Sequence, residues 1–155
     1  MKIMDFLSKK AISAAITSTK KDDVIKELVD LLIAAGEIDK SNRAKVIDAL
    51  MERESLGSTA IGQSIAIPHA KTDSVSSLVG AFALSKKGVD FDSLDGEPVY
   101  IFFMLLAAQD SAGPHLKALA RISRLFKDKY FRDSLRNCVD DKAVIKVISQ
   151  EDEKL

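Results

Sequence analysis

His69 is one of only two histidines in the chain, and it directly follows a short apolar run that ends in proline. The run Ile65–Ile67 is too short for a helix and rich in β-branched residues, so it predicts a buried strand. Pro68 has no backbone N–H to donate to a sheet, and we expect strand pairing to stop there. His69 should then stand partly free at the strand's exit, where an imidazole can act as a nucleophile, a base or a ligand.

The spacing around this histidine is distinctive. Glu54 is followed by Ile61-Gly62 and then by Ile65-Ala66-Ile67-Pro68-His69-Ala70. This segment resembles the active-site signature of the IIA phosphocarrier family of the bacterial sugar phosphotransferase system, in its fructose, mannitol and nitrogen-regulatory class. A second stretch, Glu97–Ala107 followed by His115–Arg121, is similar to the second landmark of that family. The two stretches frame most of the chain.

The resemblance implies a role for His69 as the phosphorylated nucleophile. It would accept a phosphoryl group from phosphorylated HPr or a paralogue, and pass it to a IIB domain or carry it as a signal. By the same resemblance, Nε2 is the atom expected to be phosphorylated. Because the nucleophile is a neutral imidazole, we expect the other ring nitrogen to donate a hydrogen bond to a backbone carbonyl, which would fix the tautomer.

His115 and Arg53 are the other two candidate site residues. Pro114 suits the first position of a helix, so His115 should lie in the first turn, where the positive helix end favours an anion and discourages protonation of the ring. The resemblance implies that His115 shares the site without being phosphorylated. It also implies that Arg53 is the site arginine, whose planar fork of donors suits phosphoryl oxygens.

Several polar residues near these positions have more than one interpretation. Ser55, Ser58 and Thr59 could donate hydroxyl groups to the site, but hydroxyl residues are also ordinary in loops. Glu54 matches the acidic position of the signature, and its type alone assigns it no catalytic role. Cys138 lacks a glycine-rich phosphate loop around it and is expected to be a structural thiol.

Composition limits the class of protein. A length of 155 residues predicts one domain over residues 1–155, and 46% hydrophobic residues suffice for a core. The 23 basic and 23 acidic residues cancel, so nothing draws the chain to nucleic acid or anionic lipid. The single cysteine excludes an internal disulfide. No cofactor or metal is expected, because the sequence contains no nucleotide phosphate loop and its acidic residues lack metal-ligand spacing.

The longest apolar run, Val99–Ala108, is too short to span a bilayer, which takes about 20 residues. The first residues do not have the pattern of a signal peptide, since an acid interrupts them at Asp5. We therefore expect a cytoplasmic protein. The resemblance implies that it contacts the membrane only through a permease complex.

Hydrophobic periodicity, together with the glycine, proline and capping residues between the periodic segments, predicts an α/β fold. We expect a single layered domain with a mixed central β-sheet flanked by helices. The expected elements are an irregular start over residues 3–16 with a short strand at Ala14–Ile16, a helix capped by Thr19 and stopped by Gly36, a second helix capped by Asp39 or Ser41, strands at Ser64–Ile67, Leu78–Leu84 and Val99–Leu106, a loop at Phe91–Gly96, a helix from Pro114 through Leu125, and helical turns at Lys129–Cys138 and Asp141–Ser149.

Two branches of the suspected family fit these features. One is a fructose- or mannitol-type transport IIA, and the other is a nitrogen-regulatory IIA whose phosphorylation state controls partner proteins. The absence of fused IIB or permease sequence favours the regulatory branch. A response domain of a transcriptional regulator is a lesser alternative. A metal-assisted hydrolase using His69 and His115 is remote, because the sequence offers no third ligand at a defensible spacing.

Overall fold

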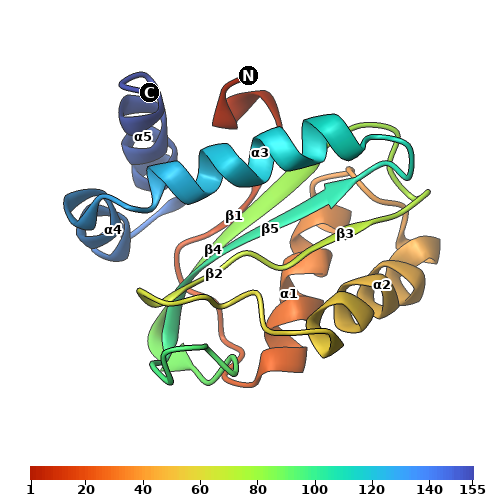
Figure 1. Ribbon diagram of the computed structural model, residues 1–155, viewed down its shortest axis with the longest axis horizontal. Helices are drawn as coiled ribbons and strands as arrows, with labels where there is room; N and C mark the ends of the chain where they lie inside the picture. Colours follow the sequence, from red (N-terminus) through yellow and green to blue (C-terminus); the bar gives the residue numbers. More distant parts are fainter.

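The computed structural model describes residues Met1–Leu155, and a mixed five-stranded sheet forms its centre (Figure 1). The strands are β1 (Leu7–Ser13), β2 (Ile65–Ala66), β3 (His69–Lys71), β4 (Val79–Val89) and β5 (Val99–Ala107). Along the sheet β1 pairs with β4 and β4 with β5, while β2 and β3 both pair with the other side of β5. Only the β4–β5 pair is antiparallel. The mixed α/β fold expected from the sequence is thus confirmed.

The helices cover both faces of this sheet (Figure 1). They are α1 (Lys21–Ala34), α2 (Arg43–Ser55), α3 (Ala112–Leu125), α4 (Lys129–Arg136) and α5 (Asp141–Asp152), with short 3₁₀ turns η1 (Ile3–Asp5) and η2 (Lys40–Asn42). One apolar cluster joins α1 and α2 to one face, and a second joins α3, α4 and α5 to the other. None of the helices combines the length and the apolarity that crossing a membrane requires.

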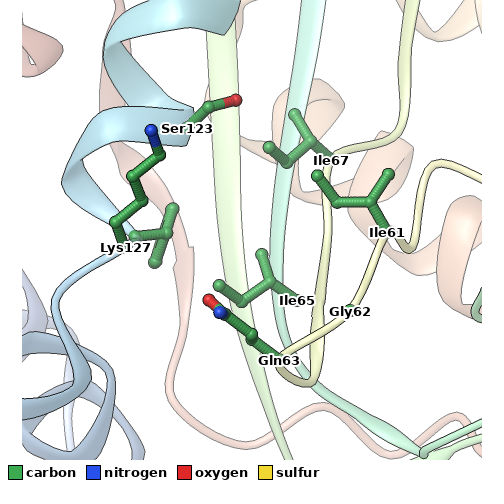
Figure 2. Close-up of a pocket in the computed structure, with 8 residues that line it drawn as sticks. Ile61, Gly62, Gln63, Ile65, Ile67, Ser123 and Lys127 are labelled. Carbon is green, nitrogen blue, oxygen red and sulfur yellow. The ribbon is translucent and has the colours of Figure 1, made fainter. Parts of the chain in front are cut away.

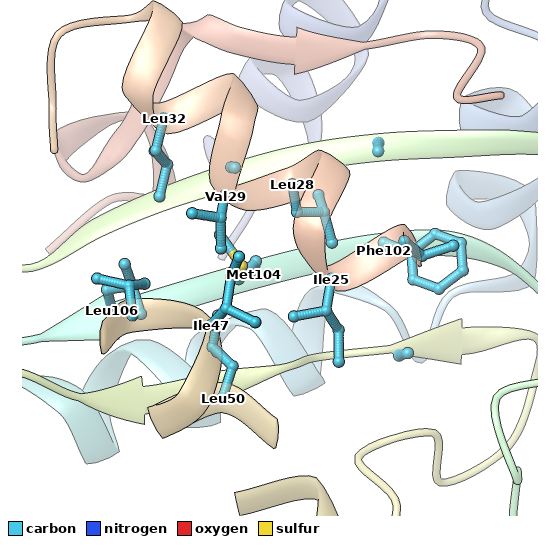
Figure 3. Packing of buried hydrophobic residues seen from close by; sticks show 14 of the residues in the cluster. Ile25, Leu28, Val29, Leu32, Ile47, Leu50, Phe102, Met104 and Leu106 are labelled. Atoms are coloured by element: carbon cyan, nitrogen blue, oxygen red, sulfur yellow. The ribbon is translucent and has the colours of Figure 1, made fainter. Parts of the chain in front are cut away.

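Strand β5 separates these two clusters. Phe102, Met104 and Leu106 point toward α1 and α2, as Figure 3 shows for the first cluster. Their neighbours Ile101, Phe103 and Leu105 belong to the second cluster. Successive side chains of a strand point to opposite faces, so a strand covered on both sides must be apolar at every position. The prediction that this run is a strand with two apolar faces is confirmed.

The beginning of the chain differs from its prediction. Residues 7–13 form β1, and the strand expected at Ala14–Ile16 is absent. The alternation of buried and exposed residues along β1 is interrupted, because the consecutive residues Lys9 and Lys10 are both exposed. At this place the pairing of β1 with β4 shifts register, between Leu7 and Ile12. A bulge of this kind breaks the period of two on which the sequence argument depends.

The helix boundaries are partly as predicted. Gly36 does end α1: it has a φ of 80°, and the following N–H of Glu37 donates to Leu32 at 2.9 Å. Such a closing turn needs the left-handed conformation that glycine adopts readily. The prediction that Thr19 caps α1 is wrong, because Lys20 holds that position without a side-chain bond. Asp39 caps η2, accepting from the Ser41 N–H at 3.0 Å, rather than α2 itself.

The expectation that strand pairing stops at Pro68 is also wrong. Pairing with β5 resumes at once, with His69 opposite Leu105 at the start of β3. Pro68 has no N–H to donate, but its carbonyl accepts from the Leu105 N–H at 2.9 Å. This bond keeps the segment between β2 and β3 attached to β5. His69 is therefore held at the start of a strand rather than released at the end of one.

Asp152 ties the end of the chain to its beginning. Its carboxylate is almost fully buried and accepts from the Ile3 N–H at 2.6 Å and from Arg121 Nε at 2.7 Å. An acceptor in this place holds η1, α3 and α5 together, since it satisfies a backbone donor and a guanidinium at once.

Replacing Asp152 with alanine should lower the free energy of unfolding by about 3 kcal/mol, because both donors lose their acceptor in a largely buried place. Urea denaturation measures the change. Asp30→Ala is the control: it breaks an exposed Arg43–Asp30 pair and should cost less than about 1 kcal/mol. Equal losses of unfolding free energy in the two variants would contradict the conclusion that Asp152 holds η1, α3 and α5 together.

Candidate functional site

The two histidines meet at one end of the sheet. His69 opens β3, which pairs with the last residues of β5, and the chain leaves β5 directly into α3, which carries His115. The imidazole centroids lie 5.4 Å apart, with the ring planes at 76°. Residues 46 positions apart in the sequence are thus brought together by the parallel pairing of β3 with β5.

A hydrogen bond fixes the protonation of His69. Its Nδ1 lies 2.8 Å from the carbonyl oxygen of Ile67. A carbonyl can only accept, so Nδ1 carries the ring proton and the neutral ring keeps its lone pair on Nε2. The expected bond to a backbone carbonyl is present, and it leaves Nε2 as the ring nitrogen with an available lone pair.

His115 is buried and its Nε2 makes no hydrogen bond to another protein group. It lies in the first turn of α3, and its own N–H already donates to the Ser111 carbonyl at 3.1 Å. Pro114 is the third helical residue after the N-cap Ser111 rather than the first, so that prediction is wrong by two positions. The position tolerates proline, because N–H groups in a first turn have no acceptor within the helix.

Both rings line one open cavity of about 330 Å³. The wall opposite them comes from α2 and the residue that follows it. The lining residues are Ala49, Glu52, Arg53, Leu56, His69, Ala70, Lys71 and His115. The structure therefore places the three residues singled out from the sequence, His69, His115 and Arg53, around a single space.

Arg53 is held at the rim of this cavity. One terminal nitrogen, Nη1, donates to the Gly57 carbonyl at 2.9 Å. A guanidinium has five N–H donors in a fixed plane, so this bond orients the group and leaves other donors for a ligand.

The hydroxyl groups considered from the sequence point elsewhere. Ser55 donates to the Glu52 carbonyl at 2.6 Å, and Ser58 donates to the Phe91 carbonyl at 2.7 Å. Thr59 donates its hydroxyl to the Glu54 carboxylate. None of these hydroxyl residues lines the cavity, so their ordinary loop interpretation describes their contacts better.

A protein-family comparison identifies the family of this chain. Residues 5–151 match the family described as "Phosphoenolpyruvate-dependent sugar phosphotransferase system, EIIA 2". The chain belongs to this family. Its members carry phosphoryl groups between proteins, so the chain is a phosphotransferase component, as the resemblance implied.

Relatives of both branches are similar to this IIA chain. It is 42% identical to a fructose-specific EIIABC component of Bacillus subtilis, over 98% of this chain but only 24% of that protein. It is 38% identical to a nitrogen regulatory protein of Bradyrhizobium diazoefficiens, over 96% of this chain and 95% of the relative. The solved structure of the nitrogen regulatory protein IIA-Ntr from Neisseria meningitidis has a TM-score of 0.85 and 32% identity, covering 94% of this chain and 98% of that one.

Lys71 is a cavity residue of this IIA chain that sequence reasoning missed. It is exposed and lies two residues after His69 on β3, which puts the two side chains on the same side of the strand. The His-x-Lys spacing could have indicated Lys71 if His69 had been placed within a strand. The prediction that strand pairing stops at Pro68 excluded that inference. Lys71 and Arg53 bring positive charge to the cavity, opposed by Glu52.

Burial and these charges keep both rings neutral. Burial is the main cause that lowers the pKa of His69; the bond to Ile67 opposes it, and the positive charge of Arg53 adds to it. Burial also lowers the pKa of His115, followed by the repulsion that a protonated His69 would exert and by the positive charge of Lys71. A lowered pKa keeps an imidazole neutral further into the acid range, which preserves a nucleophile at neutral pH.

A second cavity, of about 250 Å³, lies between β2 and the carboxyl-terminal half of α3 (Figure 2). Its walls are mainly apolar, and the figure shows Gln63, Ser123 and Lys127 around it. It contains neither histidine. No group of three or more His, Cys, Asp or Glu side chains anywhere in the chain is placed to hold a metal ion. The candidate chemistry therefore belongs to the cavity at His69.

We expect both histidines to titrate below about pH 6.5, the ordinary value for the side chain. NMR titration of the imidazole resonances measures this, and the two rings are close enough to titrate as a coupled pair. In the urea-unfolded protein both histidines should titrate at about pH 6.5. A folded-state pKa above the unfolded value for either ring would contradict the burial argument.

Proposed function

We propose that His69 receives a phosphoryl group on Nε2 from phosphorylated HPr or a paralogue, and passes it to a IIB domain or holds it as a signal. The observation that carries this proposal is the Nδ1–H bond to the Ile67 carbonyl, which leaves the lone pair on Nε2. The proposal keeps the sequence-based expectation that residues 1–155 act as one IIA domain in the cytoplasm.

The transfer step balances with the proton held at Nδ1. The Nε2 lone pair forms a bond to phosphorus while the bond between phosphorus and the donor breaks, and the donor keeps that electron pair. The product ring carries a proton on Nδ1 and a phosphoryl group on Nε2, so it is a cation next to a phosphoryl anion. The Ile67 carbonyl stabilises this cation, and the cationic ring leaves readily when the acceptor attacks.

His115 and Arg53 supply donors to the phosphoryl oxygens. His115 is buried with an unpartnered Nε2, so a phosphoryl oxygen at the cavity would satisfy it. Arg53 offers the remaining donors of its fork, and Lys71 adds a point charge. Charge that develops on the transferring group would thus meet groups that are already in place.

The nitrogen-regulatory branch is the one we favour for this chain. Supporting it, the chain is 38% identical to the Bradyrhizobium nitrogen regulatory protein, and the IIA-Ntr structure from Neisseria meningitidis matches it with a TM-score of 0.85. A transport role is the second candidate, because the fructose-specific relative has the higher identity, 42%. Incubating the phosphorylated chain with a fructose-specific IIB separates them: rapid loss of phosphate assigns transport, and retention assigns regulation.

The phosphorylation site is tested by labelling. With phosphoenolpyruvate, the first enzyme of the system and HPr, the chain should acquire one acid-labile phosphate, and ³¹P NMR should place it on Nε2 of a histidine. His69→Ala should acquire none. His115→Ala should still become labelled, although more slowly, because the nucleophile remains. Label on His115, or full label in folded His69→Ala, would refute the proposal.

Arg53→Lys should slow phosphoryl acceptance by at least about tenfold, because the substitution keeps the charge and removes the fork of donors. Rapid-quench measurement of label transfer gives the rate, and circular dichroism confirms folding. Arg43→Lys, at the other end of α2 and outside the cavity, is the matched control and should transfer normally. A normal rate for Arg53→Lys would remove this residue from the site.

A further inference from the structure

Glu54 is a buried acid for which the proposed transfer step has no use. Its side chain is only 2% exposed, and it accepts from Lys21 Nζ at 2.9 Å. It also accepts from the Thr59 N–H at 3.2 Å and from the Thr59 hydroxyl. A carboxylate in such a place stays charged only if its oxygens are satisfied, and these three donors satisfy them.

The bonds continue from Thr59 to the imidazole. The Thr59 carbonyl accepts from the Ile67 N–H at 3.3 Å, and the Ile67 carbonyl accepts from His69 Nδ1 at 2.8 Å. Two backbone residues thus lie between the buried carboxylate and the nucleophile. Ile67 uses its N–H toward Thr59 and its carbonyl toward His69, so the position of Thr59 fixes the acceptor that sets the tautomer.

Ile67 is held by its buried side chain in the second cluster and by the Leu105 N–H bond to the next carbonyl, and its own N–H donates to Thr59. Ile67 follows β2, which has only two residues, and the next residue is Pro68, which has no N–H. The tie to Thr59 is therefore the backbone donor bond that anchors Ile67. Thr59 cannot rotate away, since its N–H and its hydroxyl bind the same carboxylate.

Lys21 anchors the other side of that carboxylate. It stands at the start of α1, is 15% exposed at its side chain, and also contacts Asp92 at 3.4 Å and the Phe91 ring, whose centroid lies 4.8 Å from Nζ. These contacts hold the ammonium group, so Glu54 is fixed between α1 and the loop that follows α2.

We propose that Glu54 is a positioning residue that holds His69 in its Nδ1–H tautomer through Thr59 and Ile67. The consequence for phosphoryl transfer rests on the proposed function, whereas the tautomer does not. Glu54 also directly follows Arg53 in α2, and successive residues of a helix point about 100° apart. Arg53 therefore faces the cavity while Glu54 faces the interior, and one short segment positions both the nucleophile and its arginine.

A role in stability alone makes a different prediction. If the Lys21–Glu54 pair only holds α1 against the loop, its removal lowers the melting temperature and leaves the His69 ring unchanged. The tautomer ratio of His69 separates the two roles, because ring ¹⁵N shifts report which nitrogen carries the proton.

The experiment records long-range ¹H–¹⁵N spectra of the full chain at neutral pH. Wild type should show His69 with the proton on Nδ1. Glu54→Gln should show a mixture of the two tautomers, and its phosphoryl acceptance should fall about tenfold, the lower end of the loss seen when a partner that orients a metal-bound histidine is removed. Thr59→Val keeps the volume but lacks the hydroxyl, so it should shift the tautomer ratio in the same direction. Thr59→Ser, which retains the hydroxyl, should restore the wild-type ratio.

Asp152→Asn is the matched control. It breaks another ion pair whose carboxylate is 2% exposed, on the opposite face of the sheet, and should lower stability without changing the His69 ring. An unchanged tautomer in folded Glu54→Gln and Thr59→Val overturns the proposal; if Glu54→Gln does not fold, Thr59→Val decides. A wild type that shows the Nδ1–H tautomer but accepts no phosphate overturns the proposed function instead.

Discussion

The pairing of β5 on both of its edges is the constraint on which the rest of the structure depends. On one side the strand meets β4, and on the other it meets both β2 and β3. Its side chains fill the core on both faces, so it cannot shift without disturbing α1, α2 and α3 together. Because β3 pairs with the end of β5 and α3 begins soon after it, this register sets the distance between the two imidazoles.

The site combines positive surroundings with neutral rings. Arg53 and Lys71 attract an anion to the cavity. Burial is the main cause that lowers the pKa of the two histidines, and the charge of Arg53 adds to it for His69 and that of Lys71 for His115. A protonated imidazole could not attack phosphorus, so the charges that attract an anion add to the effect of burial in keeping the ring nitrogen available. This arrangement needs no separate base, since Nδ1 retains its proton throughout the proposed step.

Much of the fold could be predicted from local patterns, whereas His69, His115 and Arg53 were singled out as a set by the family resemblance. The apolar run at Val99–Leu106 and the Gly36 stop depend on period and on backbone freedom, and both are confirmed. The start of the chain could not be predicted, because the β1 bulge breaks its alternation. The buried ion pair of Glu54 and the position of Lys71 in the cavity could not be predicted either. Each depends on a partner brought in by tertiary structure: Lys21 for the first, and the resumed pairing after Pro68 for the second.

The strands β2 and β3 form the outer edge of the sheet beside the site, and Pro68 interrupts them. Short length, a proline and an exposed lysine at the end are the features that prevent another strand from adding to a sheet edge. A protein that approaches His69 therefore meets side chains rather than a continuous row of backbone donors and acceptors. Recognition through side chains does not require an approaching protein to present a strand, so this face places no requirement on the secondary structure of that protein.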